Sequence, residues 1–235
     1  MSKHAAAATA GPGVKRRLEP TTICFSEEPA PAHTGYRFAV RVTCNVKQSL
    51  EFRRSGQRPD VLREKDTGGS SGSTTTFPVG DLSALQSDSP CRGALRRMLA
   101  ELPQLRSLHL ADDEWDSVVP ADIVPQIVRV ARGDDANDGF TFCFAMKVHS
   151  RIILYGKKAL LMACKEKEPG SDGTETEDDC PICLDSLEGE FAVELPGCKH
   201  VFHRPCISTW FSIATTCPLC VGDVRLCALP EFLDQ

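Results

Sequence analysis

Eight potential metal ligands in one short segment constrain this chain more than any other feature. Between Cys180 and Cys220, six cysteines and two histidines follow the spacing C-x2-C-x14-C-x1-H-x2-H-x2-C-x10-C-x2-C. Each Cys-x-x-Cys pair can place two thiolates on one metal ion through a tight turn, and thiolates with imidazoles in groups of four favour tetrahedral zinc. Eight such ligands complete two sites and leave no open position for a catalytic water. The segment therefore predicts two structural zinc ions, which supply the folding energy that so small a module lacks.

The order of the ligands narrows the choice among zinc modules. It reads three Cys, two His, three Cys, whereas a PHD finger needs Cys in the fourth position, occupied here by His200, and a LIM domain needs a different middle spacing. The segment closely resembles a RING finger of the RING-H2 subtype, most similar to the RING-H2 ubiquitin ligases of plants. The resemblance covers residues 180–220 only, and every ligand position is filled.

The resemblance also implies how the ligands pair, which the spacing alone leaves open. Ligands of this family interleave in a cross-brace. The first site is then formed by Cys180, Cys183, His203 and Cys206. The second is formed by Cys198, His200, Cys217 and Cys220. All six cysteines would be occupied as ligands, so none is expected to act as a nucleophile.

A RING finger of this kind implies an E3 ubiquitin-protein ligase. It binds a ubiquitin-conjugating enzyme charged with ubiquitin, holds a substrate protein of unknown identity, and promotes transfer of ubiquitin to a substrate lysine. Because the family forms no covalent intermediate with ubiquitin, catalysis rests on proximity and orientation, and no catalytic side chain is expected.

Three apolar residues correspond to the docking groove of the family. Ile182 lies between the first two ligands, Trp210 follows the sixth, and Pro218 follows the seventh. An inward-packed Trp210 is the alternative for that position. Active members often carry a basic residue directly after the eighth ligand, but this chain has Val221 there, and the next base is Arg225. A zinc-stabilised adaptor that binds proteins without transfer activity is therefore the alternative function.

The composition of the chain argues against nucleic-acid-binding, secreted and membrane-bound proteins. A net charge of −5 over 235 residues, without a strongly basic patch, argues against generic binding of nucleic acid. No apolar run has the length of a signal peptide or a membrane span, so neither secretion nor a membrane partner is expected. Free cysteines that bind zinc require a reducing compartment, which predicts the cytoplasm or the nucleus.

The expected fold class is α+β, with an N-terminal antiparallel-sheet domain that contains two helices, a flexible acidic linker and a small C-terminal cross-brace zinc domain. Alternation of apolar and polar residues predicts strands over 36–47 and 140–148, and shorter ones at 152–155 and 158–164. Helical spacing of apolar residues predicts helices over 89–102 and within 121–132.

The domain boundaries follow from composition. Runs rich in Gly, Ser and Thr, or in acidic residues, bury too little surface to order the chain. The expected division is a disordered tail at 1–20, an α+β domain at 21–164 with a flexible insertion at 53–80, an acidic linker at 165–179, the zinc finger at 180–221 and a C-terminal tail at 222–235.

Overall fold

The computed structural model of the chain describes residues 13–30, 35–54, 56–67, 72–133, 139–167, 179–187 and 192–227. These residues form two compact units. Unit 1 is built from residues within 17–49 and 64–151, and unit 2 from residues within 13–16, 50–63 and 152–227. None of the helices in the described ranges is both long and apolar enough to cross a membrane.

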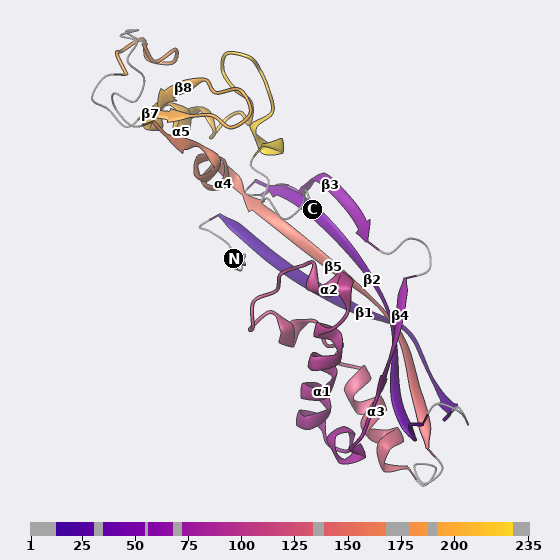
Figure 1. Ribbon diagram of the computed structural model, residues 1–235. Helices are drawn as coiled ribbons and strands as arrows, with labels where there is room; N and C mark the ends of the chain where they lie inside the picture. The colour runs from indigo at the N-terminus through magenta and orange to yellow at the C-terminus, as the bar shows by residue number, and fades with distance from the viewer. Residues whose placement is uncertain are drawn as a thin grey trace. The chain divides into compact units, whose positions relative to one another are not determined.

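The strands β1–β5 belong to one sheet (Figure 1). Their bounds are Val14–Pro29 for β1, Phe38–Arg53 for β2, Asp60–Thr67 for β3, Ser73–Pro78 for β4 and Phe140–Tyr155 for β5. The order is β1-β5-β2-β3, and β4 pairs with β2 in antiparallel register. The two strands predicted from alternation, 36–47 and 140–148, are confirmed in β2 and β5.

The sheet is mixed, whereas an antiparallel sheet was expected. Phe38 packs against Phe140 with the ring centroids 5.4 Å apart, and the Ser49 hydroxyl lies 2.9 Å from His149 Nε2. Residue numbers rise together along the two neighbouring strands, so β2 and β5 are parallel. Parallel neighbours need a long crossover connection, and the helical segment between these strands supplies it.

The crossover carries the two predicted helices, which are confirmed as α1 (Asp88–Ala100) and α3 (Ile123–Arg132). Shorter helical pieces are η2 (Leu82–Leu85), α2 (Pro103–Arg106) and η3 (Trp115–Ser117). Within unit 1, α1 and α3 lie along one face of the sheet (Figure 1), where their apolar residues form a core with alternate residues of β2 and β5. Period-2 strands and period-3.6 helices thus bury their apolar faces against each other.

Unit 2 contains the zinc-ligand segment and a second core. Its elements are α4 (Gly156–Ala163), β6 (Lys165–Glu166), β7 (Ala192–Glu194), β8 (Val201–His203), α5 (Arg204–Trp210) and η5 (Val224–Leu226), and β6-β7-β8 form a small antiparallel sheet. The core joins residues of the ligand segment to residues from the last parts of β2 and β5 and from α4. Its members include Leu50, Phe52, Ile152, Leu154, Leu160, Val193, Leu195, Phe202 and Ile207.

The segment after β5 differs from expectation. Residues 158–164 were expected to form a strand, but Gly156–Ala163 is the helix α4. Gly156 has a left-handed φ of 53°, a conformation that favours glycine and that ends the preceding strand. The sequence that follows, KKALLMA, consists of strong helix formers, and a short apolar run does not by itself distinguish a strand from a helix.

Several segments expected to be irregular contain strands. The expected tail at 1–20 includes the start of β1, and residues 1–12 lie outside the described ranges. The expected insertion at 53–80 includes β3 and β4. At the start of the expected linker, β6 pairs with β7, whereas residues 168–178 lie outside the described ranges, as do 228–235 of the expected C-terminal tail.

Candidate metal centre

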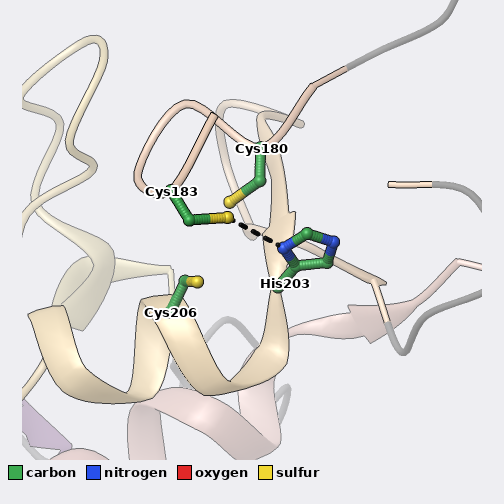
Figure 2. Close-up of side chains that lie close together, drawn as sticks. All are labelled: Cys180, Cys183, His203 and Cys206. Atoms are coloured by element: carbon green, nitrogen blue, oxygen red, sulfur yellow. Dashed lines mark hydrogen bonds between the residues drawn. The ribbon is translucent and has the colours of Figure 1, made fainter. Parts of the chain in front are cut away.

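The first group of ligands comes from three elements (Figure 2). Cys180 and Cys183 lie in the turn that opens the finger, His203 ends β8, and Cys206 lies in the first turn of α5. Their ligand atoms all lie within 4.8 Å of one another. Cys183 Sγ lies 3.3 Å from His203 Nδ1. Four soft donors converging from separate elements fit a tetrahedral zinc ion.

The second group alternates with the first along the chain. It consists of Cys198, His200, Cys217 and Cys220, whose ligand atoms again lie within 4.8 Å of one another. Cys217 Sγ lies 3.4 Å from His200 Nδ1. The ligands therefore interleave as the family resemblance implied, and the two Cys/His tetrads form the cross-brace zinc sites of a RING finger.

The two Cys-x-x-Cys turns have the same backbone hydrogen bonds. Cys180 N donates to the Asp185 carbonyl and Leu184 N donates back to the Cys180 carbonyl, at 2.8 and 2.7 Å. In the second turn, Cys217 N donates to the Gly222 carbonyl and Val221 N to the Cys217 carbonyl, at 2.8 and 3.0 Å. The backbone of each turn is thus closed by the same two hydrogen bonds around its pair of cysteines.

A third turn of this kind holds Cys198 and was missed in the sequence. Leu195 N donates to the His200 carbonyl and Lys199 N to the Leu195 carbonyl, at 2.9 and 3.1 Å. Leu195, which is fully buried, stands where the other two turns have their first cysteine. The only signal was its position three residues before a ligand, because an apolar residue replaces the thiol that marks the other turns.

The orientation of His203 is set by its second ring nitrogen. Nε2 lies 3.0 Å from the carbonyl oxygen of Ser186, and Nδ1 faces the thiol of Cys183. A proton on Nε2 that is donated to this carbonyl leaves Nδ1 free as a ligand, which is the arrangement that fixes metal-bound histidines. His203 is only 4% exposed, so its ring is enclosed by its surroundings.

The ionisation of the thiols favours a bound cation. Burial opposes ionisation of Cys180, but backbone hydrogen bonds, first from Cys183 and then from His203, lower its pKa to about 7. Burial raises the pKa of Cys198 to about 11 and that of Cys206 to about 12. Cys198 and Cys206 therefore keep their protons near neutral pH until a divalent cation replaces them, so zinc binding releases protons.

The three expected docking residues differ in exposure. Ile182 is 37% exposed, whereas Pro218 and Trp210 are half-buried. The indole N–H of Trp210 donates to the Thr216 carbonyl at 2.7 Å, and its ring packs partly against the core of unit 2. Trp210 therefore combines the inward packing considered as an alternative with a remaining accessible edge.

Further apolar residues are exposed on the two cysteine turns, and of these Leu184 and Leu219 were not singled out from the sequence. Leu219 holds the same position in the second turn as Ile182 in the first, and it is 52% exposed. Leu184 and Val221 also hold equivalent positions, with 77% and 71% exposed. The repeated sequence C-P-[I/L]-C was the available signal.

The position after the eighth ligand carries no base, and the next base is engaged elsewhere. Arg225 donates from Nε and Nη2 to the carboxylate of Asp223 and from Nη1 to Asp60, at 3.0, 2.7 and 3.0 Å. The hydrogen bond to Asp223 raises the pKa of Arg225 and lowers that of Asp223. Arg225 is thus held within unit 2.

Comparison with known proteins agrees with this geometry. The Ring finger domain family matches residues 178–221. RING-H2 finger protein ATL56 of Arabidopsis thaliana is 49% identical over 63 residues, which is 26% of this chain and 34% of the relative. E3 ubiquitin-protein ligase ATL41 of the same plant is 47% identical over 48 residues, 20% of each chain.

One match extends further, to RING-H2 finger protein ATL68 of Arabidopsis thaliana, which is 34% identical over 102 residues, 42% of this chain and 48% of that protein. The chain thus spans less than half the length of each of these relatives. Taken together with the two interleaved tetrads, the matches show that the C-terminal segment of this chain is a RING-H2 finger domain resembling those of the plant ATL proteins.

Proposed function

We propose that this protein is a RING-type E3 ubiquitin-protein ligase. It binds a conjugating enzyme charged with ubiquitin and promotes transfer of the ubiquitin to a substrate lysine. The observation that carries the proposal is the pair of exposed apolar side chains, Ile182 and Leu219, at equivalent positions on the two zinc-bound turns. A relative that matches the finger, ATL41, bears the name of an E3 ubiquitin-protein ligase.

The exposed apolar residues support docking of a protein. Leu184, which follows the ligand Cys183, is even more exposed. Apolar side chains gathered on the surface of so small a module are typical of an interaction site. Together with Pro218 and the accessible part of Trp210, they are the residues that we propose to contact the conjugating enzyme.

The chemistry of transfer then needs no nucleophile from this chain. Both tetrads are closed, so neither zinc ion would have a position for water or substrate. The finger would act by holding the charged enzyme and the substrate together in a reactive orientation. We place this activity in a reducing compartment, cytoplasm or nucleus, because the six ligand cysteines must remain thiolates.

A protein-binding adaptor without transfer activity is the second candidate. The observation that favours it is Val221, which offers no side-chain donor at the position where a base would contact both ubiquitin and the conjugating enzyme. Arg225 does not supply this base in the structure, because it is bound to Asp223 and Asp60.

An autoubiquitination assay against a panel of conjugating enzymes tests the proposal. The full chain, with two zinc ions verified by elemental analysis, should form ubiquitin conjugates with at least one enzyme. Ile182→Ala should lose the conjugates and keep both zinc ions. If the intact protein binds conjugating enzymes but forms no conjugates with any of them, the adaptor function replaces the ligase function.

A further inference from the structure

The two cysteine turns of the finger have the same backbone hydrogen bonds, but the segments that follow them contact different residues. The first turn continues into Ser186, whose carbonyl contacts Nε2 of the ligand His203. The second turn continues into Asp223, which bridges to Thr216 and caps η5 by accepting a hydrogen bond from Arg225 N at 3.0 Å. The first turn is thus supported from within the finger, and the second leads to Arg225.

Arg225 links this second turn to residues far earlier in the chain. Its Nη1 donates to Asp60 Oδ2 at 3.0 Å, and its guanidinium carbon lies 5.7 Å from the centroid of the Phe52 ring. Asp60 begins β3 and Phe52 lies near the end of β2, all within unit 2. The Arg225 side chain is only 23% exposed, so these contacts leave it little freedom.

The second turn needs such support because its backbone is unfavourable. Val221 has a φ of 60° and Leu184, at the same position of the first turn, a φ of 66°; only Val221 is β-branched, and a β-branched residue rarely adopts this left-handed region. Strain of this kind persists only where the surroundings fix the backbone. The bonds from Cys217 N to Gly222 O and from Val221 N to Cys217 O close the turn, and the Asp223–Arg225 pair follows directly.

We infer that Arg225 is a positioning residue: through Asp223, Asp60 and Phe52 it ties the second cysteine turn, and with it Pro218 and Leu219, to strands β2 and β3. The consequence for docking rests on the proposed ligase function. The consequence for the backbone of the turn does not, because it follows from the contacts alone. Residues well outside the zinc finger therefore help to set the shape of its apolar docking surface.

Amide hydrogen exchange on the full-length zinc-bound protein tests the inference, with the first turn as an internal control. Asp60→Asn removes one ion pair and leaves the Asp223–Arg225 pair, and we expect it to speed exchange at Val221 N by about twofold to fivefold. Lysine cannot donate the two guanidinium hydrogen bonds that Arg225 makes to Asp223, so Arg225→Lys should speed exchange at Val221 N by about tenfold or more. Exchange at Leu184 N should not change in either variant.

Arg204→Lys is the matched control, because Arg204 is another arginine of the finger and pairs with Glu166 at 3.4 Å. It should leave exchange at Val221 unchanged. Equal exchange at Val221 in wild type, Asp60→Asn and Arg225→Lys would overturn the inference, and so would equal acceleration at Leu184 and Val221, which would indicate general loosening.

A second measurement separates this inference from the proposed function. In a discharge assay, Arg225→Lys should raise the concentration of this protein that gives half-maximal discharge and leave the maximal rate unchanged, with both zinc ions retained. A changed maximal rate with an unchanged half-maximal concentration would contradict a positioning role. If wild type shows no discharge at all, the proposed function fails, and the exchange measurement still decides the inference.

Discussion

At Ile182, an apolar side chain stands 37% exposed between two zinc ligands whose backbone is fixed. Truncation should therefore remove contact area without disturbing the fold. We predict that Ile182→Ala weakens binding of a conjugating enzyme by about 2 kcal/mol or more, since apolar residues at the centre of an interface reach this size. Titration of the enzyme against the full chain, with zinc content measured in parallel, gives the value.

Ile23 offers a matched control for this substitution. It lies on β1 in unit 1 and is 64% exposed, so Ile23→Ala makes the same chemical change outside the finger. Binding of the conjugating enzyme should be unchanged in this variant. Equal losses in both variants, or full binding by Ile182→Ala, would show that the docking surface lies elsewhere.

Substitution of Val221 by arginine is predicted to increase activity, whereas truncation of Ile182 is predicted to weaken binding. Val221 is 71% exposed and stands directly after the eighth ligand, where an arginine could donate several hydrogen bonds to ubiquitin and the conjugating enzyme. One charge-assisted hydrogen bond is worth about 1.5–3 kcal/mol. Val221→Arg should therefore speed discharge of ubiquitin by about tenfold or more, with little change in docking affinity.

Val221→Gly separates the new donor from relief of backbone strain. Glycine accepts a φ of 60° without cost but adds no hydrogen-bond donor. Discharge by this variant should stay at the wild-type rate. If glycine and arginine speed discharge equally, the gain comes from the backbone, and the proposed role of a missing base is wrong.

Among the elements, α5 connects docking to the second zinc site. Its last residue, Trp210, donates from the indole N–H to the Thr216 carbonyl, one residue before the ligand Cys217. We predict that Trp210→Ala abolishes ubiquitin transfer and also lowers the melting temperature, because it removes both contact area and this hydrogen bond. Trp210→Phe keeps most of the ring and should lose only about 0.5–1.5 kcal/mol of stability.

Transfer assays and thermal melts of both variants, with zinc content measured, check this prediction. Both zinc ions should remain bound, because Trp210 is no ligand. Trp210→Phe should recover a measurable part of the transfer activity. Full transfer activity in Trp210→Ala would show that this residue serves the core alone.

The sequence specified the elements of the site better than the elements of the sheet. The ligands were predictable because the spacing of six cysteines and two histidines is typical of a metal site. Strands β2 and β5 were predictable because their apolar residues alternate with polar ones. The parallel pairing of these two strands was not predictable, since alternation shows which face of a strand is buried but not which strand lies beside it. Strand β4, with the sequence STTTFP, was missed because its stability comes from pairing with β2 rather than from its own apolar residues.

The links between distant residues were also beyond sequence reasoning. Asp60 and Arg225 are paired only through the fold, and nothing in either local sequence indicates the other. The same holds for Leu195, where an apolar residue fills the place of a cysteine in a turn. Such features depend on backbone geometry, which local patterns do not report.

On the scale of the whole molecule, the described residues form two separate cores, and only the core of unit 2 includes zinc ligands. Structural zinc contributes about 10–16 kcal/mol in model fingers, more than so small a core can supply. Chelation of zinc should therefore expose the amides of the finger to hydrogen exchange. Hydrogen exchange should then also become faster at residues 50–52 and 152–160, because they share the core of unit 2.

The amides of α1 and α3 serve as the reference, because they pack in the core of unit 1. Their exchange should stay slow after chelation, and re-addition of zinc should restore protection in unit 2. Loss of protection throughout both units would show that the cores are not independent. Retained protection in the finger would contradict the assignment of structural zinc.

The most direct test of the ligase function is single-turnover discharge of ubiquitin from charged conjugating enzymes to free lysine, with the full chain carrying two zinc ions. The proposed function predicts that discharge by at least one enzyme exceeds the rate of that enzyme alone and saturates with increasing concentration of the chain. Discharge at the rate of the enzyme alone, across the whole panel and with both zinc ions bound, would contradict it.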